Sequence, residues 1–279
     1  MISKKACTAT ASNHAAAPPD KTRALAELPA AMDQFCDLLL HGDDLNVRSI
    51  GQWSASDVAA HVATTLELNV KLACGTGSPM TTVEAVPAWS QAALEKVVDR
   101  TPQALVDRIQ GAVRELTKTV SGSDGNPRVP WHTGLLVPVS TLPALMVGEA
   151  MIHGYDIARA HGHRWHIPTE WAETILRGML QAISLYFLPE RSAGLRARFE
   201  IRLRGTQTRA LLSIADGQLQ VTEPNGARAD CYISGEPNGL LLLMYGRTGQ
   251  LRPTLTGRAL TWGRRPWLAL RFTHIFRSP

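Results

Sequence analysis

The sequence lacks any uninterrupted apolar run of about 18 residues or more, the length at which a helix crosses a bilayer. No membrane span and no membrane partner are therefore expected. The first 20 residues are basic but contain no apolar segment like that of a secretory signal peptide, so they are interpreted as a disordered arm.

Cysteine is scarce and widely spaced. The four cysteines are Cys7, Cys36, Cys74 and Cys231, and no two of them form a CxxC pair. This spacing argues against a cysteine zinc knuckle and against a disulfide framework. A reducing cytoplasm is the predicted location.

Lysine is absent after residue 190. From Arg191 to the C-terminus the chain has 14 Arg and 5 acidic residues, a net charge of +9, so with a formal total of +5 the first 190 residues carry −4. A basic half suits an anionic ligand. Because the arginines are spread along alternating segments with few aromatic residues among them, no nucleic-acid partner is predicted.

Helical periodicity dominates the first 190 residues. Apolar side chains recur at three- and four-residue steps in five segments, one of them broken by Thr101-Pro102, and the long Gly- and Pro-rich stretch 121–138 has no such pattern. The expected helices span residues 23–41, 54–74, 89–120, 141–161 and 169–188. We predict an all-α, up-and-down four-helix bundle over residues 21–190, after a disordered arm at residues 1–20.

The period changes after Pro189. Several short segments alternate apolar and polar residues, and Asp216-Gly217 is a hairpin turn between two of them. Two short helical pieces interrupt these predicted strands. Residues 191–279 are therefore expected to form a smaller α+β domain.

The helix expected at residues 141–161 carries ionisable side chains on an apolar stripe. Glu149 and His153 lie one turn apart on that stripe, and His61 falls on the inward stripe of the helix at 54–74. A carboxylate in apolar surroundings is unfavourable, roughly by several kcal/mol, unless a partner or an ion compensates it. Two imidazoles and one carboxylate suit a divalent ion such as zinc, with coordination positions left open.

Simpler interpretations of these residues stay open. The Glu149–His153 pair also fits a hydrogen-bonded core pair beside an ordinary core histidine. Asp57 is either an orienting group for His61 or a carboxylate favoured by the first turn of its helix. His161, His163 and His166 stand on a polar connector, where solvated side chains are the better interpretation than a metal tract.

Two motifs carry a resemblance. QWSASDVAAHVA and GEAMIHGYDIARAHG resemble, in order and separation, the two metal segments of the mycothiol-dependent maleylpyruvate isomerase and mycothiol S-transferase family of DinB-like helical bundles. The resemblance covers residues 23–188 and implies that His61, Glu149 and His153 are the metal ligands. From residue 197 onward the chain resembles the sterol-carrier-protein-like domain that often follows in this family.

The resemblance implies chemistry on mycothiol, the sugar-linked cysteine conjugate of actinobacteria, as thiol cosubstrate. A free thiol has a pKa of about 8.5, and coordination to a metal deprotonates it. The expected enzyme uses a divalent metal, zinc by preference, to activate this thiol for S-transfer or thiol exchange onto an electrophilic small molecule. Isomerisation of maleylpyruvate from cis to trans is the alternative, because both reactions need the same ligands.

Arginines of the basic half are candidates for gripping a substrate carboxylate or sugar hydroxyls through their rigid donor fork. Arg247 in MYGRTG and Arg258 in TGRALTWG are the two predicted catalytic candidates. Two readings from other classes remain: a non-catalytic protein whose second domain holds a lipid or other small apolar ligand, and a regulatory protein that uses its basic face. The oligomeric state is left open.

Overall fold

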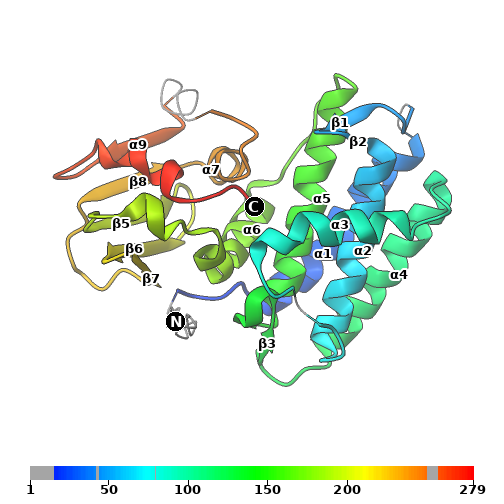
Figure 1. Ribbon diagram of the computed structural model, residues 1–279, viewed down its shortest axis with the longest axis horizontal. Helices are drawn as coiled ribbons and strands as arrows, with labels where there is room; N and C mark the ends of the chain where they lie inside the picture. Colours follow the sequence, from blue (N-terminus) through cyan, green and yellow to red (C-terminus); the bar gives the residue numbers. More distant parts are fainter. Residues whose placement is uncertain (1–15, 42–43, 79, 250–256) are drawn as a thin grey trace, which may run out of the picture.

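The computed structural model describes residues 16–41, 44–78, 80–249 and 257–279, and in these the chain forms two packed parts (Figure 1). The N-terminal half of the chain forms a helical part, and the C-terminal third forms a mixed sheet with short helices. This arrangement agrees with the predicted helical bundle followed by a smaller α+β domain. No helix among the described residues is long and apolar enough to cross a membrane.

Four long helices form the bundle. The helices at residues 21–41 and 55–73 each pack on the same two partners, the helices at residues 102–121 and 141–160. A short helix covers the second, and a sixth packs on the fifth and leads into the sheet. In chain order these helices are α1 (Lys21–His41), α2 (Ala55–Ala73), α3 (Val86–Glu95), α4 (Pro102–Ser121), α5 (Thr141–Ala160) and α6 (Thr169–Ala182).

Local sequence signals set the helix ends. The Ser54 hydroxyl accepts the Asp57 N–H at 3.1 Å, and the Asp57 carboxylate accepts the Ser54 N–H at 3.0 Å, which closes a capping box at the start of α2. The break expected at Thr101-Pro102 separates α3 from α4. The last expected helix ends earlier than residue 188, because a 3-10 turn (Ile183–Tyr186) follows α6.

Two small hairpins lie outside the sequence-based expectations. β1 (Arg48–Ile50) pairs with β2 (Trp53–Ser54), and β3 (Arg128–Pro130) pairs with β4 (Leu136–Pro138). Their strands are too short for an alternating pattern to be recognised. The second hairpin carries residues 131–135 at its tip.

A five-stranded sheet organises the C-terminal part. Its strand order is β7-β6-β5-β8-β9, with β5 and β8 parallel and every other pair antiparallel. The strands are β5 (Ala197–Leu203), β6 (Arg209–Ala215), β7 (Gln218–Thr222), β8 (Cys231–Gly235) and β9 (Ala259–Trp262). The predicted Asp216-Gly217 turn joins β6 to β7, and both residues have positive φ, 53° and 72°.

Two short helices follow in this part: α7 (Pro237–Met244) packs on α6, and α9 (Leu268–Phe272) packs on β8. Alternate β5 residues such as Phe199 face a core that includes Leu268. Between α6, the sheet and α9 lies a cavity of about 480 Å³. Its lining is mainly apolar, with Leu180, Leu212 and Phe272 among the contributors.

Most of the predicted arm, residues 1–15, lies outside the described residues. The next five residues are held against the helices. Gln181 Nε2 donates to the Ala16 carbonyl, Arg177 Nη2 to the Pro18 carbonyl and Ser140 Oγ to the Pro19 carbonyl. Residues 16–20 thereby run across the start of α5 and along α6.

Candidate metal centre

His61 lies on the side of α2 that faces α5. The capping box fixes the start of α2 two turns earlier, and the Trp53 ring packs at a tilt on the imidazole with a centroid distance of 5.0 Å. Because that apolar ring stands over the imidazole, its position in the bundle is restrained before any partner is bound.

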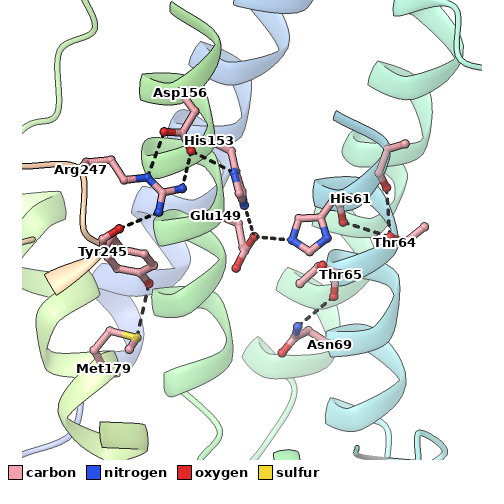
Figure 2. Close-up of polar contacts among 11 residues, drawn as sticks. His61, Thr64, Thr65, Asn69, Glu149, His153, Asp156, Met179, Tyr245 and Arg247 are labelled. Carbon is pink, nitrogen blue, oxygen red and sulfur yellow. Dashed lines mark hydrogen bonds and ion pairs between the residues drawn. The ribbon is translucent and has the colours of Figure 1, made fainter. Parts of the chain in front are cut away.

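Glu149 and His153 lie one turn apart on α5, and both point toward His61 across the interior (Figure 2). Most of α5 is buried, so these side chains stand among aliphatic residues such as Met146 and Ile152. The side chains of His61, Glu149 and His153 are 14%, 23% and 13% exposed. All three side chains are therefore mostly buried.

One carboxylate oxygen joins the two imidazoles. Glu149 Oε2 lies 3.4 Å from His61 Nε2 and 3.3 Å from His153 Nε2. The imidazole rings meet edge to face with centroids 5.1 Å apart. Three potential ligand atoms, one from each side chain, all lie within 4.8 Å of one another.

These separations fit a shared divalent ion. For zinc–ligand bonds of about 2.0–2.2 Å in a tetrahedron, neighbouring ligand atoms stand about 3.3–3.6 Å apart. Glu149 Oε2 is buried, and no hydrogen bond of good geometry satisfies it. A buried carboxylate oxygen in that state requires compensation. The three residues therefore fit a metal ion by spacing and by donor chemistry.

A chain of ionic contacts supports His153 from behind. Its Nδ1 lies 3.5 Å from Asp156 Oδ2, and Asp156 in turn binds the Arg247 guanidinium through Nε at 3.0 Å. Arg247 Nη1 also donates to the Tyr245 carbonyl at 2.7 Å. A carboxylate behind the second ring nitrogen is the usual companion of a metal-ligating histidine, since it fixes the ring and its tautomer. Figure 2 shows these contacts running from Arg247, which follows α7, to His153 on α5.

Opposite charges at the cluster stabilise each other. Burial disfavours both charged forms, but the contacts of Glu149 with the His153 and His61 imidazoles hold the pKa of its carboxyl well below the usual range. Burial likewise opposes the imidazolium of His153, yet Asp156 and Glu149 raise its pKa to about 9. His153 therefore stays protonated at neutral pH beside the ionised Glu149, and its proton competes with a metal ion for the ring nitrogen.

The negative charge of Glu149 affects the pKa values of three further side chains. Burial lowers the pKa of His132 to about 4 although Glu149 raises it, so this imidazole is neutral at pH 7. Burial and the same carboxylate raise the pKa of the Tyr186 and Tyr245 phenols. These three side chains are thus uncharged at neutral pH.

Arg258 does not share this environment. Its side chain is 66% exposed and lies 3.8 Å from a Glu236 oxygen, just before β9. Among the described residues no contact links it with His61, Glu149 or His153. The two arginines predicted as catalytic candidates thus lie in different surroundings.

Asp57, His161 and His163 have structural partners, whereas His166 is exposed. Asp57 closes the α2 capping box and forms an ion pair with Arg100, so its observed contacts are those of the simpler interpretation. His161 and His163 stack with centroids 6.1 Å apart. In the described part of the chain, the set of three His, Cys, Asp or Glu residues able to share an ion is His61, Glu149 and His153.

Sequence reasoning gave no role to Asp156 and His132. For Asp156 a signal was present, because it follows His153 by three residues on the same helical face. His132 gave no usable signal, since it stands at the tip of a short hairpin whose fold depends on contacts distant in sequence.

Comparison with known proteins gives two family matches and a shared fold. Residues 44–158, which contain all three cluster residues, match the mycothiol maleylpyruvate isomerase N-terminal domain. Residues 186–259 match the SCP-2 sterol transfer family. No curated protein sequence matches the chain.

Solved structures show the same architecture. A crystal structure of a mycothiol-dependent maleylpyruvate isomerase is similar with a TM-score of 0.53 and 19% identity, covering 83% of this chain and 91% of that one. A histidine-to-alanine mutant of such an isomerase gives a TM-score of 0.52 and 18% identity, covering 82% and 90%. At these identities the likeness concerns the fold alone.

Proposed function

From the match of residues 44–158 to the mycothiol maleylpyruvate isomerase N-terminal domain, we propose that the chain is a metal-dependent enzyme that activates the thiol of mycothiol. The reaction we favour is S-transfer or thiol exchange onto an electrophilic small molecule. Isomerisation of maleylpyruvate through reversible thiol addition is the alternative within the same chemistry.

One observation carries the proposal: Glu149 Oε2 stands 3.3 and 3.4 Å from two imidazole nitrogens in a partly open site. His61, Glu149 and His153 would hold the ion. Three protein ligands leave coordination positions for water or sulfur, which is the pattern of catalytic rather than structural sites. A bound divalent ion would lower the thiol pKa and keep sulfur as a thiolate at neutral pH.

The chain's own residues have separate tasks in this proposal. Asp156 fixes the orientation of His153, and Arg247 keeps Asp156 ionised and in place. Glu149 provides a negative charge that limits the total positive charge of the site. The apolar residues around the cluster exclude bulk water, so a thiolate is less well solvated there and remains a strong nucleophile.

The experiment compares metal content and thiol-dependent turnover in wild type, His153→Ala and His166→Ala, whose histidine is exposed on the connector. Wild type and His166→Ala are expected to bind about one equivalent of metal and to consume mycothiol with an electrophilic acceptor. His153→Ala is expected to lose both properties. Full turnover by metal-free protein would contradict the proposal.

A second candidate function is storage or transport of an apolar small molecule without catalysis, which the cavity of about 480 Å³ favours. Narrowing that cavity with Leu212→Trp would weaken the binding of a fluorescent fatty acid if this function is correct. Thiol-dependent turnover on a small polar acceptor would stay unchanged, so the two candidates are separable.

A further inference from the structure

A polar hollow lies on the face of the five-stranded sheet that points away from its core. Its volume is about 310 Å³, and four side chains line it: Arg198, Arg228, Asp230 and Arg264. Arg198 precedes Phe199 on β5, and because Phe199 faces the core, Arg198 belongs to the opposite face. Three guanidinium groups and one carboxylate give the lining a formal charge of +2. The hollow therefore suits an anion.

Asp230 holds the rim of this hollow together. Its Oδ1 accepts a hydrogen bond from Arg264 Nη2 at 2.6 Å, and its Oδ2 accepts the Arg198 N–H at 3.0 Å. Its backbone joins the same segments, because the Asp230 N–H donates to the Arg198 carbonyl and the Arg265 N–H donates to the Asp230 carbonyl, both at 2.8 Å. The start of β5, the start of β8 and the segment after β9 are thus fixed relative to one another without a ligand.

The charges of the hollow are unequally committed. Burial opposes the ionised form of Asp230, yet Arg264 and the Arg198 N–H hold the pKa of its carboxyl below the usual value. Both oxygens of that carboxylate are engaged inside the protein. The Arg198 and Arg228 side chains are exposed, and within the described residues neither guanidinium forms an ion pair or hydrogen bond. Two cations therefore remain uncommitted beside a carboxylate that is already paired.

An aromatic pair borders the hollow. Tyr232 on β8 pairs with Trp262 on β9, and their rings stack with centroids 5.3 Å apart and planes inclined by 8°. Tyr232 follows Asp230 by two positions, which places both side chains on one face of the sheet. The Ala229 N–H, next to Asp230, donates to Tyr232 Oη at 3.3 Å. The aromatic pair and the arginine hollow are therefore neighbours.

Trp262 leaves an aromatic surface uncovered. It is 40% exposed, and because β9 ends the sheet, no further strand of the described chain stands beyond it. The Arg202 guanidinium carbon lies 4.9 Å from the Tyr232 ring centroid and 5.3 Å from that of Trp262. Such cation–π contacts restrain the two rings. An exposed, restrained indole is a surface on which a planar ring stacks.

We propose that this hollow binds a phosphate monoester that carries a planar ring, of the chemical class of a nucleoside monophosphate. The phosphate lies among Arg198, Arg228 and Arg264, and the ring stacks on the exposed side of Trp262. A phosphate monoester carries a charge of about −1.5 to −2 at pH 7, which complements the lining. The planar donor fork of arginine matches phosphate oxygens in geometry as well as in charge.

The shape of the hollow favours a small ligand over a polymer. A volume of about 310 Å³ is typical of the smaller small-molecule sites. Nucleic acid is held by phosphate contacts spread along a groove, whereas these arginines converge on one place. The site is separate from the proposed reaction, since among the described residues no contact links the four lining residues with His61, Glu149 or His153.

The first test follows the ³¹P resonance of adenosine 5′-monophosphate during titration with wild type, Arg198→Gln, Arg228→Gln and Arg209→Gln. Wild type is expected to bind this nucleotide at a single site. Its Kd should rise about tenfold in Arg198→Gln and in Arg228→Gln, because each loses a charged contact with phosphate. Arg209 is exposed on β6 and lies opposite Arg202, away from the hollow, so Arg209→Gln removes the same charge and should leave the Kd unchanged.

The second test separates the two halves of the site. Trp262→Leu should raise the Kd of adenosine 5′-monophosphate about tenfold, the effect of losing one stacked base, and should leave the Kd of inorganic phosphate unchanged. Arg228→Gln should weaken both ligands. Both substitutions replace exposed side chains, so melting temperatures are expected to stay close to that of wild type.

Several results would overturn the proposal. An equal rise in Kd for Arg209→Gln and Arg228→Gln would mean that net charge alone attracts the nucleotide. Binding of wild type only to a thymidine oligonucleotide would assign the arginines to nucleic acid, and binding only to phosphatidylglycerol vesicles would assign them to a lipid surface. Thiol-dependent turnover should be the same in Arg228→Gln as in wild type, and a parallel loss of turnover and nucleotide affinity would contradict a separate site.

Discussion

The guanidinium of Arg247 meets the carboxylate of Asp156 at two points, Nε to Oδ1 at 3.0 Å and Nη2 to Oδ2 at 2.5 Å. These residues come from different parts of the fold, since Arg247 follows α7 and Asp156 lies on α5. Because Asp156 also contacts His153, the C-terminal domain takes part in orienting a candidate ligand of the bundle.

Replacing Arg247 should therefore affect both stability and metal binding. Arg247→Ala leaves a carboxylate that is 2% exposed without its cation, which should cost about 3–5 kcal/mol of unfolding free energy. Metal affinity should fall about 10- to 100-fold through the loss of orientation at His153. Urea unfolding and metal titration measure the two effects.

Arg258→Ala is the matched comparison. Its exposed ion pair with Glu236 at 3.8 Å should contribute about 0–1 kcal/mol, and metal affinity should not change. If Arg258→Ala weakened metal binding as much as Arg247→Ala, the contact chain through Asp156 would not be the cause.

The metal-free protein should lose stability at alkaline pH. The folded pKa of His153, about 9, lies above the value of about 6.5 expected in the unfolded chain, so the unfolded state binds fewer protons between these values. The stabilising contribution is complete below pH 6.5 and disappears as pH rises through 9. Thermal unfolding of metal-free protein between pH 6 and 10 measures it.

Two controls identify the group responsible. Asp156→Asn removes a carboxylate that raises the pKa of folded His153, so the alkaline loss should be smaller and should be complete at a lower pH. Metal-loaded protein should show no such loss in this range, because the ion replaces the proton. An identical alkaline profile for metal-free wild type and His153→Ala would assign the effect to another residue.

The α2 capping box should stabilise the helix that carries His61. Ser54→Ala removes the hydroxyl that accepts the Asp57 N–H, and a cap of this kind contributes about 0.5–2 kcal/mol. Ser54→Asp, which keeps an acceptor, should retain most of that stability. Chemical denaturation of both variants compares them, and equal loss in the two would mean that the cap is not responsible.

Gly154 keeps the backbone beside His153 close to Trp165. A Cβ at position 154 would stand 2.2 Å from Trp165 Cζ2, and the indole is fixed by its hydrogen bond to the Met151 carbonyl at 2.9 Å. Gly154→Ala should therefore cost about 1–3 kcal/mol. It should also weaken metal binding, because α5 or the indole must move.

Gly239→Ala in α7 is the control for that substitution. A Cβ there meets nothing within 4 Å, so the change should leave stability equal or raise it by up to about 1 kcal/mol. Melting temperatures and metal titrations on both glycine variants test the comparison. Similar melting temperatures for Gly154→Ala and Gly239→Ala would show that the Trp165 indole can move aside without loss of stability.

Helical periodicity was enough to predict the main elements. The apolar stripe that carries Glu149 and His153 predicted a helix at residues 141–161, and α5 spans Thr141–Ala160. The Ser54 and Asp57 pair predicted where α2 begins. Alternation after Pro189 and the Asp216-Gly217 turn gave the character of the second domain. These signals are local, so a sequence carries them without knowledge of the tertiary fold.

Contacts between distant segments were not predictable in the same way. Arg247 was proposed as a substrate-gripping residue, whereas in the structure its guanidinium is committed to Asp156, 91 residues earlier. Neither the sequence around Arg247 nor the sequence around Asp156 indicates that these two side chains form an ion pair. The position of His132 is likewise set by Trp131, on which its ring packs, and by Met80, whose carbonyl accepts a hydrogen bond from the hairpin tip.

The placement of Arg247 bears on how such chains can diverge by recombination. A chimaera that joins this bundle to another sheet domain would keep every proposed ligand and yet strand Asp156 without its cation. Such a chimaera is then expected to keep its stability only when the incoming sheet domain places an arginine beside Asp156. The fold changes near residue 190, but the Asp156–Arg247 ion pair joins the parts on either side of that boundary.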